Sequence, residues 1–259
     1  MKAIILSAGQ GKRLLPLTTE VPKCLLSVDA NRTVLELQLR ALAQCGISHV
    51  TIVTGFGAEQ VERFLATHTF AGLDIRTRYN PFFATSNNLA TCWLAIPEMT
   101  EDFVLLNGDT LFEPTILHRL LSSPHAPVTL AIDQKGEYDE DDMKVTLNGS
   151  RRITAIGKTL PASRVNGESI GFMAFRGQGV TAFRTALDTA IRDPAALHLW
   201  YLSVVHSLAD RGLVGALSIK GLWWAEIDTL ADLAHARAHF PSPPTRLMTP
   251  GLSSALPNP

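Results

Sequence analysis

The sequence predicts an α/β protein with a doubly wound, mostly parallel sheet and a mixed or antiparallel lid. In the first half of the chain, short apolar segments alternate with segments of helical periodicity, which is typical of parallel strands joined by helices. In the second half, short strand-like segments follow one another with little helix between them. A chain of 259 residues, 46% of them hydrophobic, can bury a large core.

The elements of the first half alternate regularly. Residues 2–7 are apolar on both faces and predict a buried central strand. Residues 34–45 carry apolar side chains at helical spacing, and Gly46 suits the end of that helix. The remaining elements predicted here are strands at 49–55, 74–79 and 102–109 and helices at 58–67, 88–96 and 114–121.

The second half predicts the lid and a closing helix. Helices are expected at 179–192, 196–210 and 229–240, with Thr229 as the N-cap of the last. We take residues 1–240 as one domain, and the proline-rich segment 241–259 as a disordered tail. The strands predicted in this half are 128–133, 143–147, 152–157, 169–175, 213–219 and 223–228.

Composition excludes several classes of protein. Lys and Arg number 23 against 24 Asp and Glu, so the chain has no basic excess for binding nucleic acid. Its three cysteines are widely spaced and form no CxxC pair, which argues against disulfides and zinc. No segment has the apolar length of a signal peptide or a membrane span. The sequence therefore predicts a cytoplasmic protein without membrane insertion, and it is compatible with a homodimer.

The strongest functional signal is the segment LSAGQGKRLLPLTTEVPKCL at residues 6–25. The small residues Ala8, Gly9 and Gly11 allow backbone N–H groups to approach phosphate oxygens closely. Arg13 and Lys23 supply the positive charge that a triphosphate requires. The spacing matches neither a Walker A loop nor the GxGxxG of a dinucleotide fold.

Two later segments carry carboxylates. Asp109 follows a predicted buried strand, where it can bind Mg²⁺ or simply form a turn. Asp228 lies in the segment WAEIDT at 224–229, just before the closing helix. Asp109, like Gly9 and Gly55, comes just past a strand end, and ligands bind parallel sheets at that edge.

Together, the segments 6–25, 107–109 and 224–229 resemble the signature of the sugar-nucleotide pyrophosphorylase superfamily of nucleotidyltransferases. The resemblance implies the Rossmann-like fold of nucleotide-diphospho-sugar transferases. It also implies that Arg13 and Lys23 hold the triphosphate, and that Asp109 and Asp228 are catalytic and bind Mg²⁺. Ser7 departs from the alanine usual in the family. The residues we assign to nucleotide binding are Leu6, Ala8, Gly9, Gly11, Gly55, Tyr79, Asn87 and Asn88.

The paired asparagines narrow the resemblance to branches that use CTP. Asn87 and Asn88 open a predicted helix and resemble the N-N-x-x-S pattern of phosphocholine, inositol-1-phosphate and aminoethylphosphonate cytidylyltransferases, with Thr91 in place of the serine. Asparagine offers both a donor and an acceptor to a pyrimidine or ribose. The alternative is a helix N-cap pair, which Ser86 and Asn87 would suit.

The segments 142–145, 156–158 and 167–172 also resemble the phosphocholine cytidylyltransferase-like branch. We assign Lys158, and after it Lys144, to the acceptor phosphate, although either could be an exposed strand residue. The acidic run 139–142 is interpreted as a solvated turn. The residues that complete the expected acceptor pocket are Glu168, Gly171 and Glu226.

The resemblance thus predicts a Mg²⁺-dependent cytidylyltransferase. It would transfer CMP from CTP to a small phosphorylated or phosphonylated alcohol or amine, of the phosphocholine or 2-aminoethylphosphonate type, and release pyrophosphate. The alternative is a sugar-1-phosphate nucleotidyltransferase that uses UTP, GTP or dTTP. A catalytically inactive nucleotide-binding subunit is disfavoured because Arg13, Lys23, Asp109 and Asp228 are all present.

Overall fold

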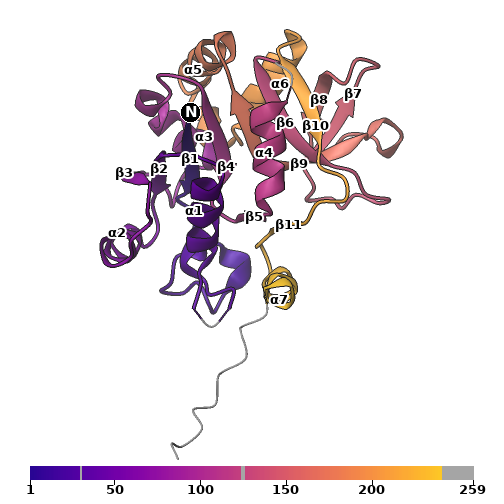
Figure 1. The fold of residues 1–259 in the computed structure, drawn as a ribbon. Helices are drawn as coiled ribbons and strands as arrows, with labels where there is room; N and C mark the ends of the chain where they lie inside the picture. The colour runs from indigo at the N-terminus through magenta and orange to yellow at the C-terminus, as the bar shows by residue number, and fades with distance from the viewer. Residues whose placement is uncertain (30, 124–125, 241–259) are drawn as a thin grey trace, which may run out of the picture.

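A nine-stranded mixed sheet runs through the centre of the computed structural model, which describes residues 1–29, 31–123 and 126–240 (Figure 1). Its first half is parallel, and β1 lies between its two parallel neighbours. The segment 241–259, for which disorder is predicted, lies outside the described residues. The strands of this half are β1 (Lys2–Ser7), β2 (His49–Thr54), β3 (Asp74–Tyr79) and β4 (Phe103–Asn107), in the order β4-β1-β2-β3.

Helices cover both faces of the sheet, as the doubly wound prediction requires. Side chains alternate along β1, so Ala3 and Ile5 pack on one face and Ile4 and Leu6 on the other. The first face is covered by α1 (Val34–Gln44), α2 (Ala58–Thr67) and α4 (Pro114–Ser122). The second face is covered by α3 (Asn88–Leu94), α5 (Gln178–Ala190) and α6 (Leu202–Asp210).

The strands of the second half continue the same sheet. β9 (Gly167–Phe175) inserts antiparallel between β4 and β6 (Val128–Asp133), and β10 (Val214–Ser218) then pairs parallel with β6. All nine residues of β9 are buried, so this strand belongs to the interior of the sheet. Of the strands predicted to form the lid, only two lie outside the main strand order of the described sheet. They form a hairpin of β7 (Lys144–Leu147) and β8 (Ile153–Gly157).

Tertiary contacts shorten two predicted elements. The predicted helix 196–210 is divided into a 3-10 helix (Pro194–His198) and α6, because the Tyr201 backbone N–H between them donates to Asn88 Oδ1 at 2.9 Å. The strand predicted at 102–109 ends at Asn107. The next strand, β5 (Thr110–Phe112), pairs antiparallel with β11 (Trp224–Glu226). Other 3-10 helices are Lys12–Leu14, Lys23–Leu25, Ile96–Glu98 and Ala162–Arg164.

The chain closes with α7 (Leu230–His239), which packs on the loops after β1 rather than on the sheet (Figure 1). Thr229 is its N-cap, as predicted, and forms a capping box with Asp232. Among the described residues, no helix combines the length and the apolar character needed to cross a membrane.

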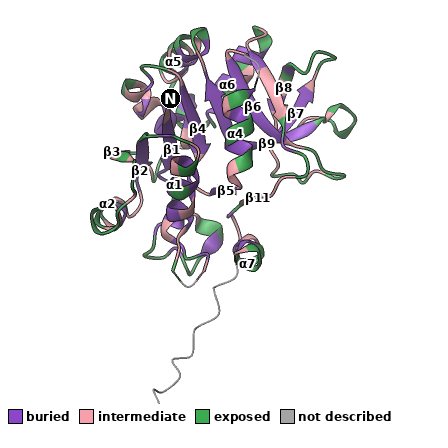
Figure 2. Cartoon of the chain, in the orientation of Figure 1, coloured by how far each residue is buried: buried purple, intermediate pink, exposed green. Residues whose placement is uncertain are grey.

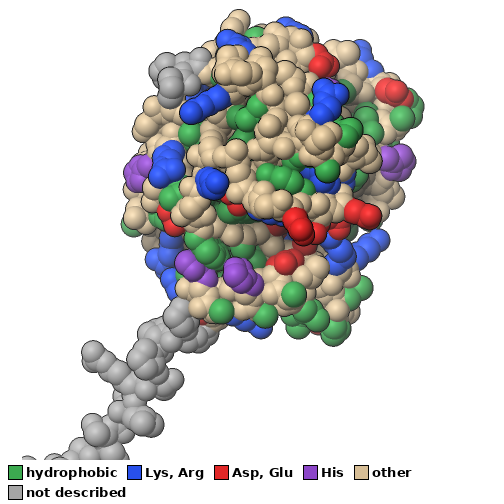
Figure 3. Space-filling model, turned by 90° about the vertical axis from the view of Figure 1, so that its right-hand side faces the viewer, with side chains coloured by type: hydrophobic (Ala, Val, Ile, Leu, Met, Phe, Trp, Pro, Cys, Tyr) green, Lys and Arg blue, Asp and Glu red, His purple; other side chains and the backbone are tan. Residues whose placement is uncertain are grey.

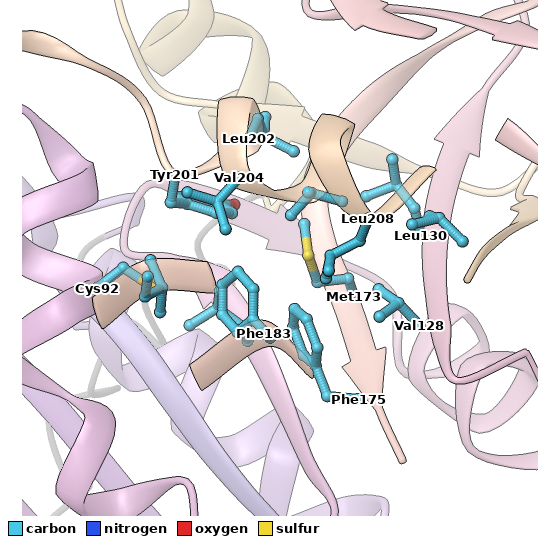
Figure 4. Close-up of a cluster of buried hydrophobic side chains, with 14 of the residues drawn as sticks. Cys92, Val128, Leu130, Met173, Phe175, Phe183, Tyr201, Leu202, Val204 and Leu208 are labelled. Carbon is cyan, nitrogen blue, oxygen red and sulfur yellow. The ribbon is translucent and has the colours of Figure 1, made fainter. Parts of the chain in front are cut away.

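The central strands of the sheet are mostly buried (Figure 2). Stacked phenylalanines, of which Figure 4 labels Phe175 and Phe183, connect these strands to a helix. The Phe175 ring on β9 lies 4.7 Å from the Phe103 ring on β4 and 4.3 Å from the Phe183 ring on α5, measured between centroids. All three side chains are fully buried. Phe175 therefore joins the parallel and mixed halves of the sheet to the helical layer.

We expect Phe175→Ala to lower the free energy of unfolding by about 3–5 kcal/mol, because it removes a buried ring and leaves a cavity. Urea denaturation followed by circular dichroism measures this change. Phe82→Ala is the matched control, since that ring is 51% exposed, and it should cost less than about 1 kcal/mol. Equal losses in the two variants would contradict this account of the core.

Candidate active site

Parallel pairing brings the carboxyl ends of β1 and β4 side by side, with Leu6 opposite Asn107. The loops that follow these strands enclose a small cavity of about 90 Å³. Most of its lining consists of residues that the sequence assigned to nucleotide binding and catalysis. The lining residues are Leu6, Ser7, Gly9, Gly11, Lys23, Cys24, Gly108 and Asp109.

Two glycines permit the close packing of this cavity. Gly11 has φ +73°, and a Cβ there would lie 3.0 Å from Lys23 Cδ. A Cβ on Gly108 would lie 1.9 Å from Ser7 Oγ. The absence of both side chains therefore allows the Lys23 stem and the Asp109 turn to lie against the loop after β1.

Lys23 lies between the two predicted metal-binding carboxylates. Its Nζ is 2.6 Å from Asp109 Oδ2 and 2.5 Å from Asp228 Oδ1. Burial acts to lower the pKa of Lys23, but the charges of Asp109 and Asp228 outweigh it and raise the pKa above its usual value. The ammonium group therefore stays charged at neutral pH.

The two carboxylates are 119 positions apart (228 minus 109), and the strand pair β5–β11 brings them together. Glu226 of β11 lies opposite Thr110 of β5, and the Ile227 backbone N–H donates to the Asp109 carbonyl at 3.0 Å. Asp228 follows directly, and its own N–H donates to Asp232 Oδ2 of α7 at 3.0 Å. The pairing of β5 with β11 and the capping of α7 thus fix the position of Asp228.

The charge network extends through Arg13 to Asp141 and Lys158. One guanidinium nitrogen is 2.6 Å from Asp228 Oδ2, and the other is 2.9 Å from Asp141 Oδ2. The second oxygen of Asp141 is 3.1 Å from Lys158 Nζ. On the face of the molecule that Figure 3 shows, several acidic and basic side chains lie next to one another.

Asp141 contacts two of the predicted site residues, which the sequence interpretation did not foresee. We predicted a solvated turn at 139–142, and Asp141 is indeed 71% exposed, yet it joins Arg13 to Lys158. The hydrogen bond from Lys158, followed by the charges of Lys158 and Arg13, holds the pKa of Asp141 below its usual value. Sequence spacing gave no signal of this contact, because Arg13 lies 128 positions away.

The carboxylate pair fits a magnesium ion. Within the described residues, Asp109 Oδ1 is buried and has no hydrogen-bond partner, so one oxygen of the pair is free to bind a cation. Mg²⁺ prefers one or two carboxylates together with water and substrate phosphates. No group of three or more His, Cys, Asp or Glu residues in the described ranges is arranged to hold a metal by itself.

The two asparagines make contacts within the chain. Asn87 Oδ1 accepts from the Asn88 backbone N–H at 2.8 Å and caps α3, whereas Asn88 Oδ1 accepts from Tyr201 N–H. Both side-chain oxygens are therefore engaged, and Asn87 alone acts as a helix cap. Gly55 packs under the loop after β1, where a Cβ would lie 2.6 Å from the Ala8 carbonyl oxygen. Tyr79, at the end of β3, is 51% exposed.

The residues that the sequence assigned to acceptor binding make different contacts in the structure. Lys158 Nζ lies 4.9 Å from the centroid of the Trp200 ring, in addition to its contact with Asp141. Lys144 is buried, and its ammonium donates to the carbonyls of Asp139 and Lys158, so in this structure it supports the loops rather than facing open space. Gly171 packs against the Asn107 side chain at φ +67°.

Glu226 and Glu168 are carboxyls with raised pKa values. Desolvation by the surrounding protein, followed by the charges of Asp109 and Asp228, raises the pKa of Glu226 to about 8, although the residue keeps contact with solvent. Burial, followed by a hydrogen bond with Asp142, raises the pKa of Glu168 to about 7. Lys135 pairs with Glu168 Oε1 at 3.1 Å beside a cleft of about 700 Å³.

The raised pKa of Glu168 makes stability depend on pH. The folded protein binds this proton more tightly than the unfolded chain, so the stabilisation is complete below about pH 4.5 and is lost as the pH rises through about 7. We therefore expect Glu168→Gln to gain stability relative to the unmodified protein between pH 5 and pH 8, measured by urea denaturation. The exposed Glu59→Gln is the control, and its free energy of unfolding should depend on pH as that of the unmodified protein does. If Glu168→Gln showed this same pH dependence, the raised pKa of Glu168 would be refuted.

The chain belongs to the MobA-like NTP transferase domain family, whose model matches residues 3–210. A CMP-5'-(3-aminopropyl)phosphonate synthase of Streptomyces rubellomurinus is 39% identical over 131 residues, which cover 51% of this chain and 20% of the relative. The chain thus spans one fifth of that relative's length. A CTP:phosphoglutamine cytidylyltransferase of Campylobacter jejuni is 25% identical over 257 residues, covering 90% of this chain and 98% of the relative.

Solved structures share the fold. A CTP:phosphocholine cytidylyltransferase from Streptococcus pneumoniae superposes with a TM-score of 0.72 at 20% identity, over 92% of this chain and 98% of that chain. This likeness confirms the predicted Rossmann-like fold of nucleotide-diphospho-sugar transferases. The family and the relatives confirm the resemblance to nucleotidyltransferases, including the branch that uses CTP.

Proposed function

We propose that the protein is a cytidylyltransferase that transfers CMP from CTP to a small phosphorylated or phosphonylated alcohol or amine and releases pyrophosphate. The observation that carries this proposal is the position of Lys23. Its charged ammonium lies between Asp109 and Asp228, next to the small-residue loop at the carboxyl ends of β1 and β4. A buried cation flanked by carboxylates and glycines suits the transfer of a nucleotidyl group.

The proposed chemistry is a direct in-line displacement. An oxygen of the acceptor's phosphate or phosphonate forms a bond to the α-phosphorus of CTP, and the bond between this phosphorus and the oxygen of the β-phosphate breaks. Lys23 stabilises the negative charge on the α-phosphate, and Arg13 binds the leaving pyrophosphate. The acceptor oxygen is already anionic, so no general base is required.

Mg²⁺ held by Asp109 and Asp228 would neutralise phosphate charge during the transfer. Lys158 is proposed to bind the acceptor phosphate, because Asp141 pairs with Arg13 through one oxygen and with Lys158 through the other. Glu168, Gly171 and Glu226 are proposed to border the acceptor, and Lys144 to hold the loop that carries Lys158. An acceptor with an ammonium group agrees with two relatives, a CMP-5'-(3-aminopropyl)phosphonate synthase and a choline-phosphate cytidylyltransferase.

The alternative is a sugar-1-phosphate nucleotidyltransferase that uses UTP, GTP or dTTP. One observation favours it: the side-chain oxygens of Asn87 and Asn88 are engaged within the chain, so base recognition by these residues needs a change of partners. The phosphate-binding part of the site would serve either reaction. The base and the acceptor therefore have to be identified together.

Pyrophosphate release with Mg²⁺ tests the proposal. The panel combines CTP, UTP, GTP, ATP and dTTP with phosphocholine, 2-aminoethylphosphonate, phosphoethanolamine, inositol-1-phosphate and glucose-1-phosphate. We expect turnover with CTP and one amino-alcohol phosphate or phosphonate. Turnover restricted to a sugar phosphate and another nucleotide would establish the alternative. No turnover with any pair, together with no binding of any of the five nucleotides, would reject both functions.

A further inference from the structure

Asp141 connects the loop after β1 with the residue that follows β8. Its Oδ2 is 2.9 Å from Arg13, which belongs to the loop after β1, and its Oδ1 is 3.1 Å from Lys158, which follows β8. The proposed function assigns Arg13 to the leaving pyrophosphate and Lys158 to the acceptor phosphate. The Asp141 carboxylate therefore forms ion pairs with both of the cations, Arg13 and Lys158, to which the substrate phosphates would bind.

The turn that carries Asp141 is held by hydrogen bonds on both sides of it. The Asp139 N–H donates to Asp142 Oδ2 at 2.6 Å, and the Asp142 N–H donates to the Asp139 carbonyl at 3.2 Å. Lys135 pairs with the same Asp142 oxygen at 2.8 Å, and the buried Lys144 ammonium donates to the Asp139 carbonyl. The backbone is thus fixed, and the exposed Asp141 side chain is presented to Arg13 and Lys158.

We propose that Asp141 is a positioning residue that orients Arg13 and Lys158 before substrates bind and is then exchanged for the phosphate oxygens of the two substrates. This inference rests on the proposed function, because it needs one phosphate group at Arg13 and another at Lys158. Exposed ion pairs are weak enough to exchange, and Asp141 is 71% exposed. A phosphate carries more charge and more acceptor oxygens than one carboxylate, so it replaces Asp141 on each cation.

The exchange gives a specific kinetic signature. Asp141→Asn keeps the shape of the side chain but removes its charge, so substrate phosphates no longer compete with a carboxylate. We expect KM for both substrates to fall about threefold to tenfold. We expect kcat to change little, because the substrate phosphates have already replaced Asp141 on both cations when the transfer occurs. A residue that only supports the fold would raise KM or leave it unchanged.

Binding of inorganic pyrophosphate, measured by calorimetry, tests the same point without turnover. Asp141→Asn should bind it about threefold to tenfold more tightly, and Asp141→Glu should restore the original affinity. Glu140→Gln is the matched control, because it changes the net charge equally and is exposed on the same turn. It should leave pyrophosphate affinity and both KM values unchanged.

The outcomes separate this inference from the proposed function. Turnover in the substrate panel with equal pyrophosphate affinity in the unmodified protein and Asp141→Asn would overturn the inference alone. Tighter binding in both Asp141→Asn and Glu140→Gln would also overturn it, because general charge would then explain the effect. An unmodified protein that neither turns over any pair nor binds pyrophosphate would overturn the inference and the function together.

Discussion

Replacing Lys23 with alanine is expected to lower kcat about a thousandfold while the protein still folds. The ammonium of Lys23 is the buried positive charge closest to the carboxylate pair, and it stays charged because Asp109 and Asp228 raise its pKa. A preorganised charge of this kind stabilises the developing charge on the transferred phosphorus, and its loss is felt mainly in kcat. Steady-state pyrophosphate release, with the substrate pair identified in the panel, measures the effect.

Mg²⁺ should also stabilise the Lys23→Ala variant against heat more strongly than it stabilises the unmodified protein. Without Lys23, the partly buried carboxylates of Asp109 and Asp228 repel each other, so the thermal midpoint should fall in the absence of divalent cations. Added Mg²⁺ should raise the midpoint of Lys23→Ala more than that of the unmodified protein. Exposed Lys12→Ala is the control and should retain both turnover and midpoint. Near-normal turnover of Lys23→Ala would defeat the proposed mechanism.

The parallel half of the fold could be predicted because its signals are local. β1 is apolar on both faces since it is buried between parallel neighbours, and a strand of this kind is recognisable without its partners. The cap at Thr229 could be predicted for the same reason, because its hydrogen bonds join residues within one helical turn. Each of these features is determined by residues close together in the chain.

The features that could not be predicted depend on distant partners. The insertion of β9 between β4 and β6 is set by sheet pairing, which leaves no local sign in an apolar strand. The break before α6 arises because Asn88 accepts a hydrogen bond from the Tyr201 backbone, 113 positions away. The family resemblance supplied both carboxylates of the site. Asp141 is one of four consecutive acidic residues at 139–142, so nothing in the sequence distinguished it as the one that pairs with Arg13 and Lys158.

Asp109→Asn is the second substitution for which we expect a large effect, a loss of about a thousandfold in kcat. Asp109 is the carboxylate at the end of the central sheet, and its buried Oδ1 has no hydrogen-bond partner among the described residues. The amide keeps the shape of the side chain but removes the charge that Mg²⁺ and Lys23 require. The Mg²⁺ concentration for half-maximal activity should therefore rise, by about tenfold or more.

The measurement is a Mg²⁺ titration of activity and of the thermal midpoint for Asp109→Asn and for Asp74→Asn. Asp74 begins β3, so it lies at the opposite end of the parallel strands from the site, and its loss should change neither titration. A weaker Mg²⁺ response in Asp109→Asn alone would assign the metal to the strand end of β4. Identical titrations in both variants would instead mean that Asp109 acts only as the counter-ion of Lys23, and the metal would then need other ligands.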